Sequence, residues 1–561
     1  MSSIRLTGLA TGIDTDAMIK ELMKAERTRV DKVQQDKQIL QWRQELYNSI
    51  NKDFANFILN TRKEFGLNVT TITGSIDGKS LNNLTWVKKA VSSNENIVKA
   101  STTSQAANGT HEITVHRLAD GVKGVSSKDI REDIDKILTS LGAEIDGEDG
   151  EKIKIPESFS FEINDKTITV NKNDTMSTII KRINDSGAGV QASYDANIGR
   201  FFIQTKTTGT DAKLSFRGTD ELSRNFIDAL KLNITSGDTT LYTYSESEHL
   251  FDKDQFTGTN ALISFNGATG IEQPTNQFTI NGISLDLRQA DPDTKITIRV
   301  DTDVDAVYNK IKDFVDKYNE IMDKMGKLLS EKKYRDYRPL TSEQKEAMKE
   351  KEIELWEEKA KSGILRNDTV ISSIMQNIRS SLYSKVDKLE NSPLNSLYQL
   401  GIETEEYSPG AIGGKLQIDE EKLRKMITED VNGVLEVLFS EAKTTIEDGR
   451  TVPVKESGGV ITRIFNNMID GMSDILGKAG PGEDSNLYRN INTRLMIDFV
   501  TEHSSMSTLD KDIKDIDERI KDLNTMLINK ENRYYSKFAA MEKFIQQMNS
   551  QSSWLMQQLG M

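Results

Sequence analysis

Apolar residues recur three and four positions apart at both ends of the chain, whereas in the middle they alternate with polar residues. The helical pattern covers residues 14 to 65 and returns between 487 and 559. Near the C-terminus it forms a seam spaced four and three apart, at Leu509, Ile513, Ile516, Ile520, Leu523 and Leu527. This spacing predicts long helices at both ends, which pack against each other or against helices of other chains.

The first predicted helix begins after Asp14, a residue type that caps helix N-termini well. Proline is absent before Pro156 and after Pro481, which permits long helices because proline inside a helix costs ~3 kcal/mol. A helix of about 50 residues would be roughly 75 Å long. Its apolar stripe is narrow, so we expect it to need partner helices. The stripe comprises Ile19, Leu22, Val30, Val33, Leu40, Tyr47, Ile50, Phe54, Phe57 and Phe65.

The middle of the chain predicts β-strands with one short helix between them. Alternating segments run over residues 111–119, 159–170, 200–209, 277–287 and 294–300. The helix, residues 175–187, turns Ile179, Ile180 and Ile183 inward. The string Phe-x-Ile-Asn occurs at 161–164 and again at 278–281, which is a weak internal repeat.

Helical periodicity returns after Asp301 and continues to the end of the chain. Asp303 or Asp305 is expected to cap the next helix, and Thr341 with Gln344 fits a capping box. Further helices are predicted at 371–389 and 420–438, with a hairpin at 401–418 between them and a loop at 477–484.

The order helix, β, helix predicts an α+β multidomain fold with β-rich domains inserted into a helical stalk. We expect a leg from residues 1–45 and 500–561, with long coiled-coil-like helices, and a stalk with a small hairpin from 46–75 and 306–499. A β-rich domain would span 76–128 and 240–305, and a β-rich head 129–239. The helical interface is predicted at Ile19, Leu22, Val30, Val33, Leu509, Ile513, Ile516, Ile520, Leu523, Leu527 and Phe538. We favour packing of these ends against other molecules over packing within one core.

Composition narrows the class of protein. The chain has 561 residues and a formal net charge of −14, which does not favour nucleic-acid binding because phosphate contacts need clustered Lys and Arg. There is no cysteine, so disulfides and thiolate chemistry are excluded. The N-terminus lacks the pattern of a secretory signal peptide, and no apolar stretch is long enough to span a bilayer, so we expect neither a cleavable signal nor membrane insertion.

No motif predicts an active site, a metal site or a cofactor. His111 and His116 lie on one predicted strand at an odd spacing, which places them on opposite faces. The run Asp301, Asp303, Asp305 begins like a calcium loop but lacks its required glycine and final glutamate. The acidic residues between 144 and 151 allow calcium, but a solvated loop explains them better.

Several segments, in order along nearly the whole chain, resemble the flagellar hook-associated protein 2 family, the filament cap proteins. They include LTGLATGIDTDAMIKELMKAE (6–26), AANGTHEITVHRLA (106–119), PLTSEQKEAMKEKEIELWEEKAKSGILRND (339–368) and GIETEEYSPGAIGGKLQIDEEKL (401–423). The segment from Phe159 to VQASYD is similar to the repeat shared by flagellins and hook proteins. The family usually has Tyr where this chain has His111, and many relatives have Pro or Ala where Thr28 and Arg29 follow the first helix segment.

The resemblance implies a structural protein, not an enzyme, that caps the growing filament as a ring of subunits. It implies contacts with flagellin, hook-filament junction proteins and a type III export chaperone, and an extracellular place at the flagellar tip, reached without a cleavable signal. The terminal helices would act as legs, and the β domains would form the cap plate.

Other functions stay open on the sequence alone. An adhesin could use the β domains to bind host glycan or mucin, although no aromatic sugar platform is evident. Flagellin itself is a structural alternative, but the segment 339–368 argues against it. An enzyme such as a peptidase or glycosidase lacks any paired catalytic motif.

Overall fold

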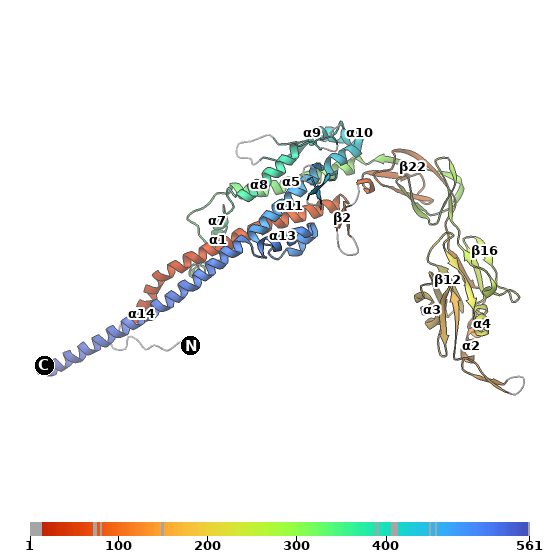
Figure 1. Cartoon of the computed structure of the whole chain (residues 1–561), viewed down its shortest axis with the longest axis horizontal. Helices are drawn as coiled ribbons and strands as arrows, with labels where there is room; N and C mark the ends of the chain where they lie inside the picture. Colours follow the sequence, from red (N-terminus) through yellow and green to blue (C-terminus); the bar gives the residue numbers. More distant parts are fainter. Residues whose placement is uncertain are drawn as a thin grey trace. The chain divides into compact units, whose positions relative to one another are not determined.

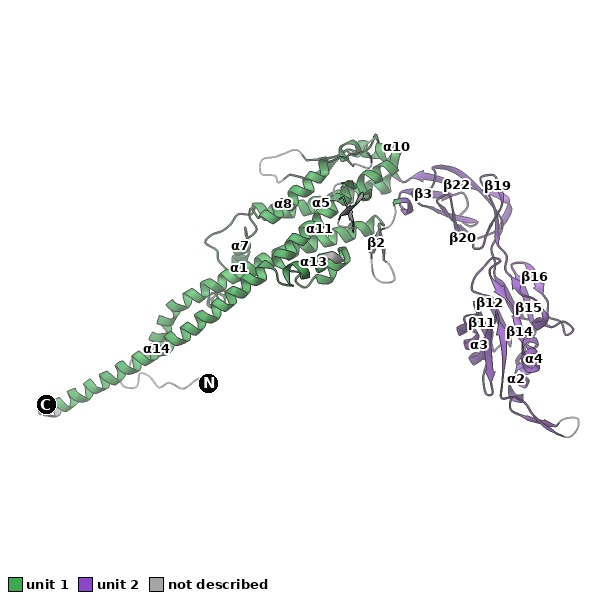
Figure 2. Cartoon of the chain, viewed as in Figure 1, with its two compact units in different colours: residues 1–81, 304–561 green, residues 82–303 purple. Residues whose placement is uncertain are grey.

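The computed structural model describes residues 14–558, except 71–75, 79–80, 147–150, 387–388, 390–391, 406–412, 448–449 and 455–456. The chain divides into two compact units, residues 1–81 with 304–561 and residues 82–303 (Figure 2). The first unit is helical and is built from both ends of the chain, and the second is built from strands (Figure 1).

The helices of the first unit include one very long helix at each end. Asp14 caps α1 by accepting a hydrogen bond from the Ala17 amide, as the sequence predicts. The helices are α1 (Thr15–Glu64), α5 (Val304–Ser330), α6 (Ser342–Ala347), α7 (Glu350–Lys361), α8 (Thr369–Tyr383), α9 (Leu397–Leu400), α10 (Glu420–Phe439), α11 (Val460–Ala479), α12 (Ser485–Ile491), α13 (Thr493–His503) and α14 (Thr508–Gln558).

The core of this unit forms where α1, α5, α8 and α11 pack together. Phe57 of α1 lies between Phe314 of α5 and Phe465 of α11, with ring centroids 5.5 and 6.0 Å apart. Gly471 of α11 permits a close crossing with α8, since a Cβ there would lie 2.6 Å from a side-chain carbon of Ile374. The apolar face of α1 is therefore continuous with the stalk core from Trp42 onward.

The helical unit also contains short two-stranded sheets. They pair β1 (Asn68–Thr70) with β2 (Ile76–Gly78), β23 (Ile402–Thr404) with β24 (Leu416–Ile418), and β25 (Thr444–Glu447) with β26 (Arg450–Pro453). The hairpin predicted at 401–418 is present as β23 and β24, and its tip lies outside the described residues.

Two corrections concern helix ends in this unit. The loop expected from Gly477 begins only after α11 ends at Ala479. Gly477 stays helical because its missing side chain admits the His503 ring of α13, which a Cβ would approach to 2.7 Å. The helix expected at 371–389 also ends early, at Tyr383 of α8. Asp419 caps α10 by accepting from the Lys422 amide, and α10 is kinked at Asp430, whose carboxylate accepts from the Gly433 amide at 2.9 Å.

The second unit contains two hydrophobic cores. The first core lies between the sheet β19-β18-β5-β22-β3 and the sheet β20-β21-β4. The strands are β3 (Lys88–Ser92), β4 (Val98–Thr102), β5 (Gly109–Arg117), β18 (Ala261–Phe265), β19 (Ala268–Gln273), β20 (Gln277–Ile280), β21 (Ile283–Leu287) and β22 (Asp291–Thr302).

The second core, which we call the head core, lies under the sheets β11-β12-β6-β15-β16 and β10-β9-β14 with three short helices. These elements are β6 (Val122–Ser126), β9 (Ser158–Ile163), β10 (Lys166–Asn171), β11 (Val190–Asp195), β12 (Arg200–Thr205), β14 (Phe216–Gly218), β15 (Leu232–Ser236), β16 (Thr239–Tyr242), α2 (Arg131–Ser140), α3 (Met176–Asp185) and α4 (Glu221–Ala229). Smaller pairs are β7 (Glu144–Asp146) with β8 (Lys152–Lys154) and β13 (Lys213–Leu214) with β17 (Phe256–Thr257).

The Phe-x-Ile-Asn repeat has a structural meaning that the sequence did not reveal. Asn164 follows β9 and Asn281 follows β20, and both adopt positive φ, 48° and 51°. Each asparagine therefore makes a tight hairpin turn, a conformation that Asn tolerates better than most residues. The segments 159–170 and 277–287 are accordingly hairpins rather than single strands.

Candidate functional site

The two ends of the chain pack along each other as an antiparallel pair of helices, α1 and α14. Polar contacts fix the register. Gln44 donates to Asp510 at 2.7 Å, Lys37 pairs with Asp517 at 2.6 Å, and Lys530 pairs with Glu26 at 2.7 Å. Across these three contacts the residue number falls along α1 as it rises along α14, as it must in an antiparallel pair of helices. The sequence pattern favoured packing of these helices against other molecules. Within one chain, the structure shows that they pack against each other.

The predicted interface residues take three different environments. Four of them, Ile19, Val30, Val33 and Leu509, are buried. Leu22 is 41% exposed, so it faces away from the α1–α14 contact. The others are partly buried and form the seam of α14: Ile513, Ile516, Ile520, Leu523, Leu527 and Phe538. The intramolecular pair thus covers the seam only in part, and contacts of this set with other molecules remain a prediction.

The last turns of α14 extend past the start of α1 (Figure 1). Large apolar side chains there face solvent, with Phe544 and Trp554 62% and 59% exposed. Other exposed apolar residues of the two helices are Met18, Met526, Ile528, Met541, Met548, Leu555 and Met556. An apolar surface of this kind on a helix is typical of a place where other helices bind.

A segment between α5 and α8, residues 331–368, braces the middle of α1; we call it the strap. Arg338 forms an ion pair with Asp36, and Gln35 donates to the Pro339 carbonyl at 2.6 Å. Trp356 donates to the Arg338 carbonyl at 2.8 Å and so holds the strap in shape. Sequence reasoning missed this contact, although the isolated Trp356 in a highly charged stretch was the available signal.

Several side chains of α1 have pKa values shifted by their surroundings. Burial raises the pKa of Asp31, and Glu343 of the strap raises it further. The hydrogen bond from Lys530 lowers the pKa of Glu26. Burial also raises the pKa of Tyr47, whose hydroxyl donates to Asp368 at 2.6 Å and ties α1 to the start of α8. These contacts hold the helices together.

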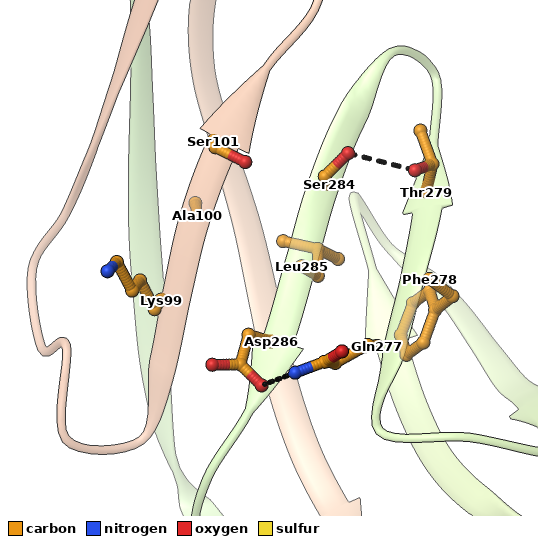
Figure 3. A pocket seen from close by; sticks show the side chains of 9 residues that line it. All are labelled: Lys99, Ala100, Ser101, Gln277, Phe278, Thr279, Ser284, Leu285 and Asp286. Carbon is orange, nitrogen blue, oxygen red and sulfur yellow. Dashed lines mark hydrogen bonds between the residues drawn. The ribbon is translucent and has the colours of Figure 1, made fainter. Parts of the chain in front are cut away.

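Several pockets open onto the surface of the described parts of the chain. One of about 370 Å³ lies on the outer face of the sheet β20-β21-β4 (Figure 3). Its lining includes Thr279 bonded to Ser284 at 2.9 Å and Gln277 bonded to Asp286 at 3.1 Å. Both bonds join β20 to its neighbour β21, as is usual on an exposed sheet face.

The histidines make separate local contacts. His111 approaches the Ala107 carbonyl at 3.2 Å, and His116 approaches the Ser264 hydroxyl at 2.7 Å. Among the described residues, no group of three His, Cys, Asp or Glu side chains is arranged to hold a metal ion. Part of the acidic stretch 144–151 lies outside the described residues. No helix in the described part of the chain has the length and apolarity needed to cross a membrane.

Comparison with known proteins places these features in a family. A family model described as flagellar hook-associated protein 2 C-terminus matches residues 258–550, and its N-terminal counterpart matches residues 11–121. The flagellin hook IN motif matches residues 158–207. The flagellar hook-associated protein 2 of Halalkalibacterium halodurans is 30% identical over 99% of both chains. That of Thermotoga maritima is 29% identical over 72% of this chain and 55% of its own length.

A solved structure gives a weaker likeness. The D1-D2-D3 domains of the flagellar cap protein FliD from Escherichia coli match with a TM-score of 0.48 and 21% identity, over 76% of this chain and 95% of theirs.

Proposed function

The chain belongs to the flagellar hook-associated protein 2 family, and we propose that it caps the flagellar filament as a ring of identical subunits. The cap would retain exported flagellin at the filament tip and promote its folding and insertion. The observation that carries this proposal is the pair α1–α14, whose apolar surface is only partly covered within the chain.

The helical pair suits transient binding. Its α14 end presents apolar side chains spaced for docking against other helices, which is how amphipathic helices bind grooves and bundles. Several of them are methionines, whose flexible side chains adapt to more than one partner surface. We propose flagellin and neighbouring subunits as these partners, with hook-filament junction proteins and an export chaperone as further ones.

The same proposal assigns parts of the chain to roles. The leg comprises residues 1–45 and 500–561, and the stalk 46–75 and 306–499. The β-rich domain (76–128 and 240–305) and the head (129–239) would form the plate. The head sheet also contains β6, which precedes residue 129, and β16, which continues past residue 239 to Tyr242. The head core therefore extends beyond residues 129–239 on both sides. We place the protein outside the cell at the flagellar tip, exported without a cleavable signal, and assign it no enzymatic activity.

None of the matches reported above names a glycan-binding protein, so the adhesin alternative gains no support from them.

The test replaces the exposed apolar end of α14 in a strain that lacks the native cap. Phe544, Met548 and Trp554 are changed together to Ser, and the control changes three exposed polar residues, Lys537, Lys543 and Gln546, to Ser. We expect the apolar variant to be secreted yet to leave short or absent filaments and flagellin monomers in the medium. Normal filaments from the apolar variant would refute the leg mechanism.

A further inference from the structure

The hairpin of β7 and β8, which we call the arm, extends from the head past α2 (Figure 1). Its register pairs Ile145 with Ile153, so both isoleucines lie on one face of the ribbon. They are 48% and 53% exposed. The opposite face carries charged residues, among them Glu144 and Lys152, which form an ion pair at 3.6 Å. The arm is thus an amphipathic ribbon whose apolar face is open.

The apolar face of the arm continues from the head core. The Ile155 amide donates to the Ala143 carbonyl at 2.9 Å, which extends the ladder toward the core. Ile155 packs against the head core, whereas Ile153, two residues nearer the tip on the same face, is exposed. A two-stranded ribbon alone is marginally stable in water. An apolar face that continues from the core into solvent in this way indicates that another molecule covers it.

The head also carries a surface that fits the arm, the outer face of the sheet β11-β12-β6-β15-β16. The inner face of this sheet is buried in the head core. On the outer face, Val125 of the central strand β6 pairs with Phe202 of β12, and Val125 is 41% exposed. This apolar pair matches the isoleucine pair of the arm in size and in its flat, strand-like presentation.

The charges of the two surfaces are complementary. Lys123 and Arg200 lie on the outer face of the sheet on either side of the apolar pair, by the same alternation that exposes Val125. Lys123 also pairs with Asp120 at 3.0 Å, and Arg200 donates to the Ser126 carbonyl at 2.6 Å. On the arm, Asp146 and Glu151 form no ion pair among the described residues, and Glu151 lies two residues before Ile153. Acidic side chains at the tip of the arm would therefore meet basic ones around the apolar pair.

We propose that the arm of one subunit binds the outer sheet face of the head of a second copy of this chain, with Ile145 and Ile153 seated on Val125 and Phe202. This interface rests on the proposed ring. The two surfaces differ, so the contact is head-to-tail, and contacts of that kind close into rings when the rotation allows it. The arm then sets the neighbour of each subunit in the plate.

Cysteine crosslinking tests the contact cleanly because the chain has no cysteine of its own. Ile153→Cys is placed in one preparation of the full chain and Val125→Cys in another, and the two are mixed and oxidised. The control pairs Ile153→Cys with Val91→Cys, a valine on β3 that is 56% exposed and so more accessible than Val125. We expect a disulfide-linked dimer from the first mixture at about tenfold or greater yield over the control and over either variant alone.

Four outcomes separate the interface from the proposed function. A dimer from the 153/125 mixture alone supports the contact. A dimer from Ile153→Cys alone would mean that two arms meet, and would overturn the head-to-tail contact. If the chain assembles by mass measurement and retains flagellin, yet the 153/125 mixture gives no dimer, the arm contact is wrong and the cap function stands. Loss of flagellin retention by the unmodified chain would instead refute the function itself.

Discussion

Lys530 of α14 donates a hydrogen bond to Glu26 of α1, with the Nζ and Oε2 atoms 2.7 Å apart, although the two residues come from opposite ends of the sequence. Both side chains are partly shielded from solvent. The pair lies near the free end of the leg, so it reports on whether the two terminal helices stay together.

The first prediction is that the free end of the leg separates at low pH. The hydrogen bond from Lys530 lowers the pKa of Glu26 below its ordinary value of 4.5. A carboxylate whose pKa falls on folding contributes stability that is complete above the unfolded pKa and is lost as the pH falls through the folded one. We therefore expect α1 and α14 to move apart at this end below about pH 4.5. Energy transfer between dyes on Lys20→Cys and Lys537→Cys measures the separation.

Glu26→Gln is the matched control for that measurement. Gln keeps the shape of the side chain but cannot titrate, so the dye-labelled variant should lose this part of the pH response. A response of unchanged size in the variant would show that another group governs the separation.

The second prediction concerns the strap. Trp356 is partly buried, and its ring lies 4.6 Å from that of Tyr337. Trp356→Ala removes this packing and the hydrogen bond to the Arg338 carbonyl, so we expect α1 to lose about 2 kcal/mol of local stability, less than for a fully buried Trp. Trp356→Phe keeps most of the packing and should cost about 1 kcal/mol, the net value of one hydrogen bond.

Hydrogen exchange of the α1 amides between Lys24 and Trp42 measures this effect. About 1.4 kcal/mol of lost protection corresponds to a tenfold faster exchange. Equal exchange rates in Trp356→Ala and the unmodified chain would show that the strap does not brace α1.

The third prediction separates the covered and open sides of α14. Ile516 is partly buried against α1, whereas Ile528 is 59% exposed. Ile516→Asp places a charge in the seam, and we expect a loss of about 1–3 kcal/mol in helix pairing. Ile528→Asp should change pairing by no more than about 0.5 kcal/mol. Limited proteolysis of α14 ranks the two variants, and the reverse order would mean that the seam faces outward.

The sequence predicted the terminal helices because their apolar spacing and the Asp14 cap are local features. It could not decide whether the seam of α14 pairs with α1 or with another chain, since both partners satisfy the same spacing. Leu22 fits the stripe by position but is exposed, because α14 covers only part of the α1 surface. The strap contact at Arg338 and Asp36 depends on tertiary packing that no periodicity encodes.

The arm shows the same limit in the second unit. The acidic stretch around Asp146 reads as a loop in the sequence, because its two strands are short and the residues between them are rich in glycine and acid. Only the register of Ile145 with Ile153 shows that the two isoleucines share a face. A pattern two residues long on each strand is too short to recognise by alternation.

The last prediction concerns the crossing of α8 and α11 at Gly471. A Cβ at this position would lie 2.6 Å from Cγ1 and 2.7 Å from Cδ1 of Ile374, which is itself buried. Ala gains about 1 kcal/mol over Gly in helix propensity, but overpacking a core costs about 1–3 kcal/mol. The steric term should win because both helices are held in the core, so Gly471→Ala should destabilise the stalk by about 1 kcal/mol in urea unfolding.

Rescue distinguishes this steric cause from a general loss of stability. Ile374→Val removes Cδ1, so the double variant Gly471→Ala with Ile374→Val should be more stable than the sum of the two single changes predicts, by about 0.5 kcal/mol or more. Lys478→Ala, at an exposed position of the same helix, should change stability by no more than about 0.5 kcal/mol. Strict additivity of the two core changes would mean that the helices move apart and accommodate the methyl group.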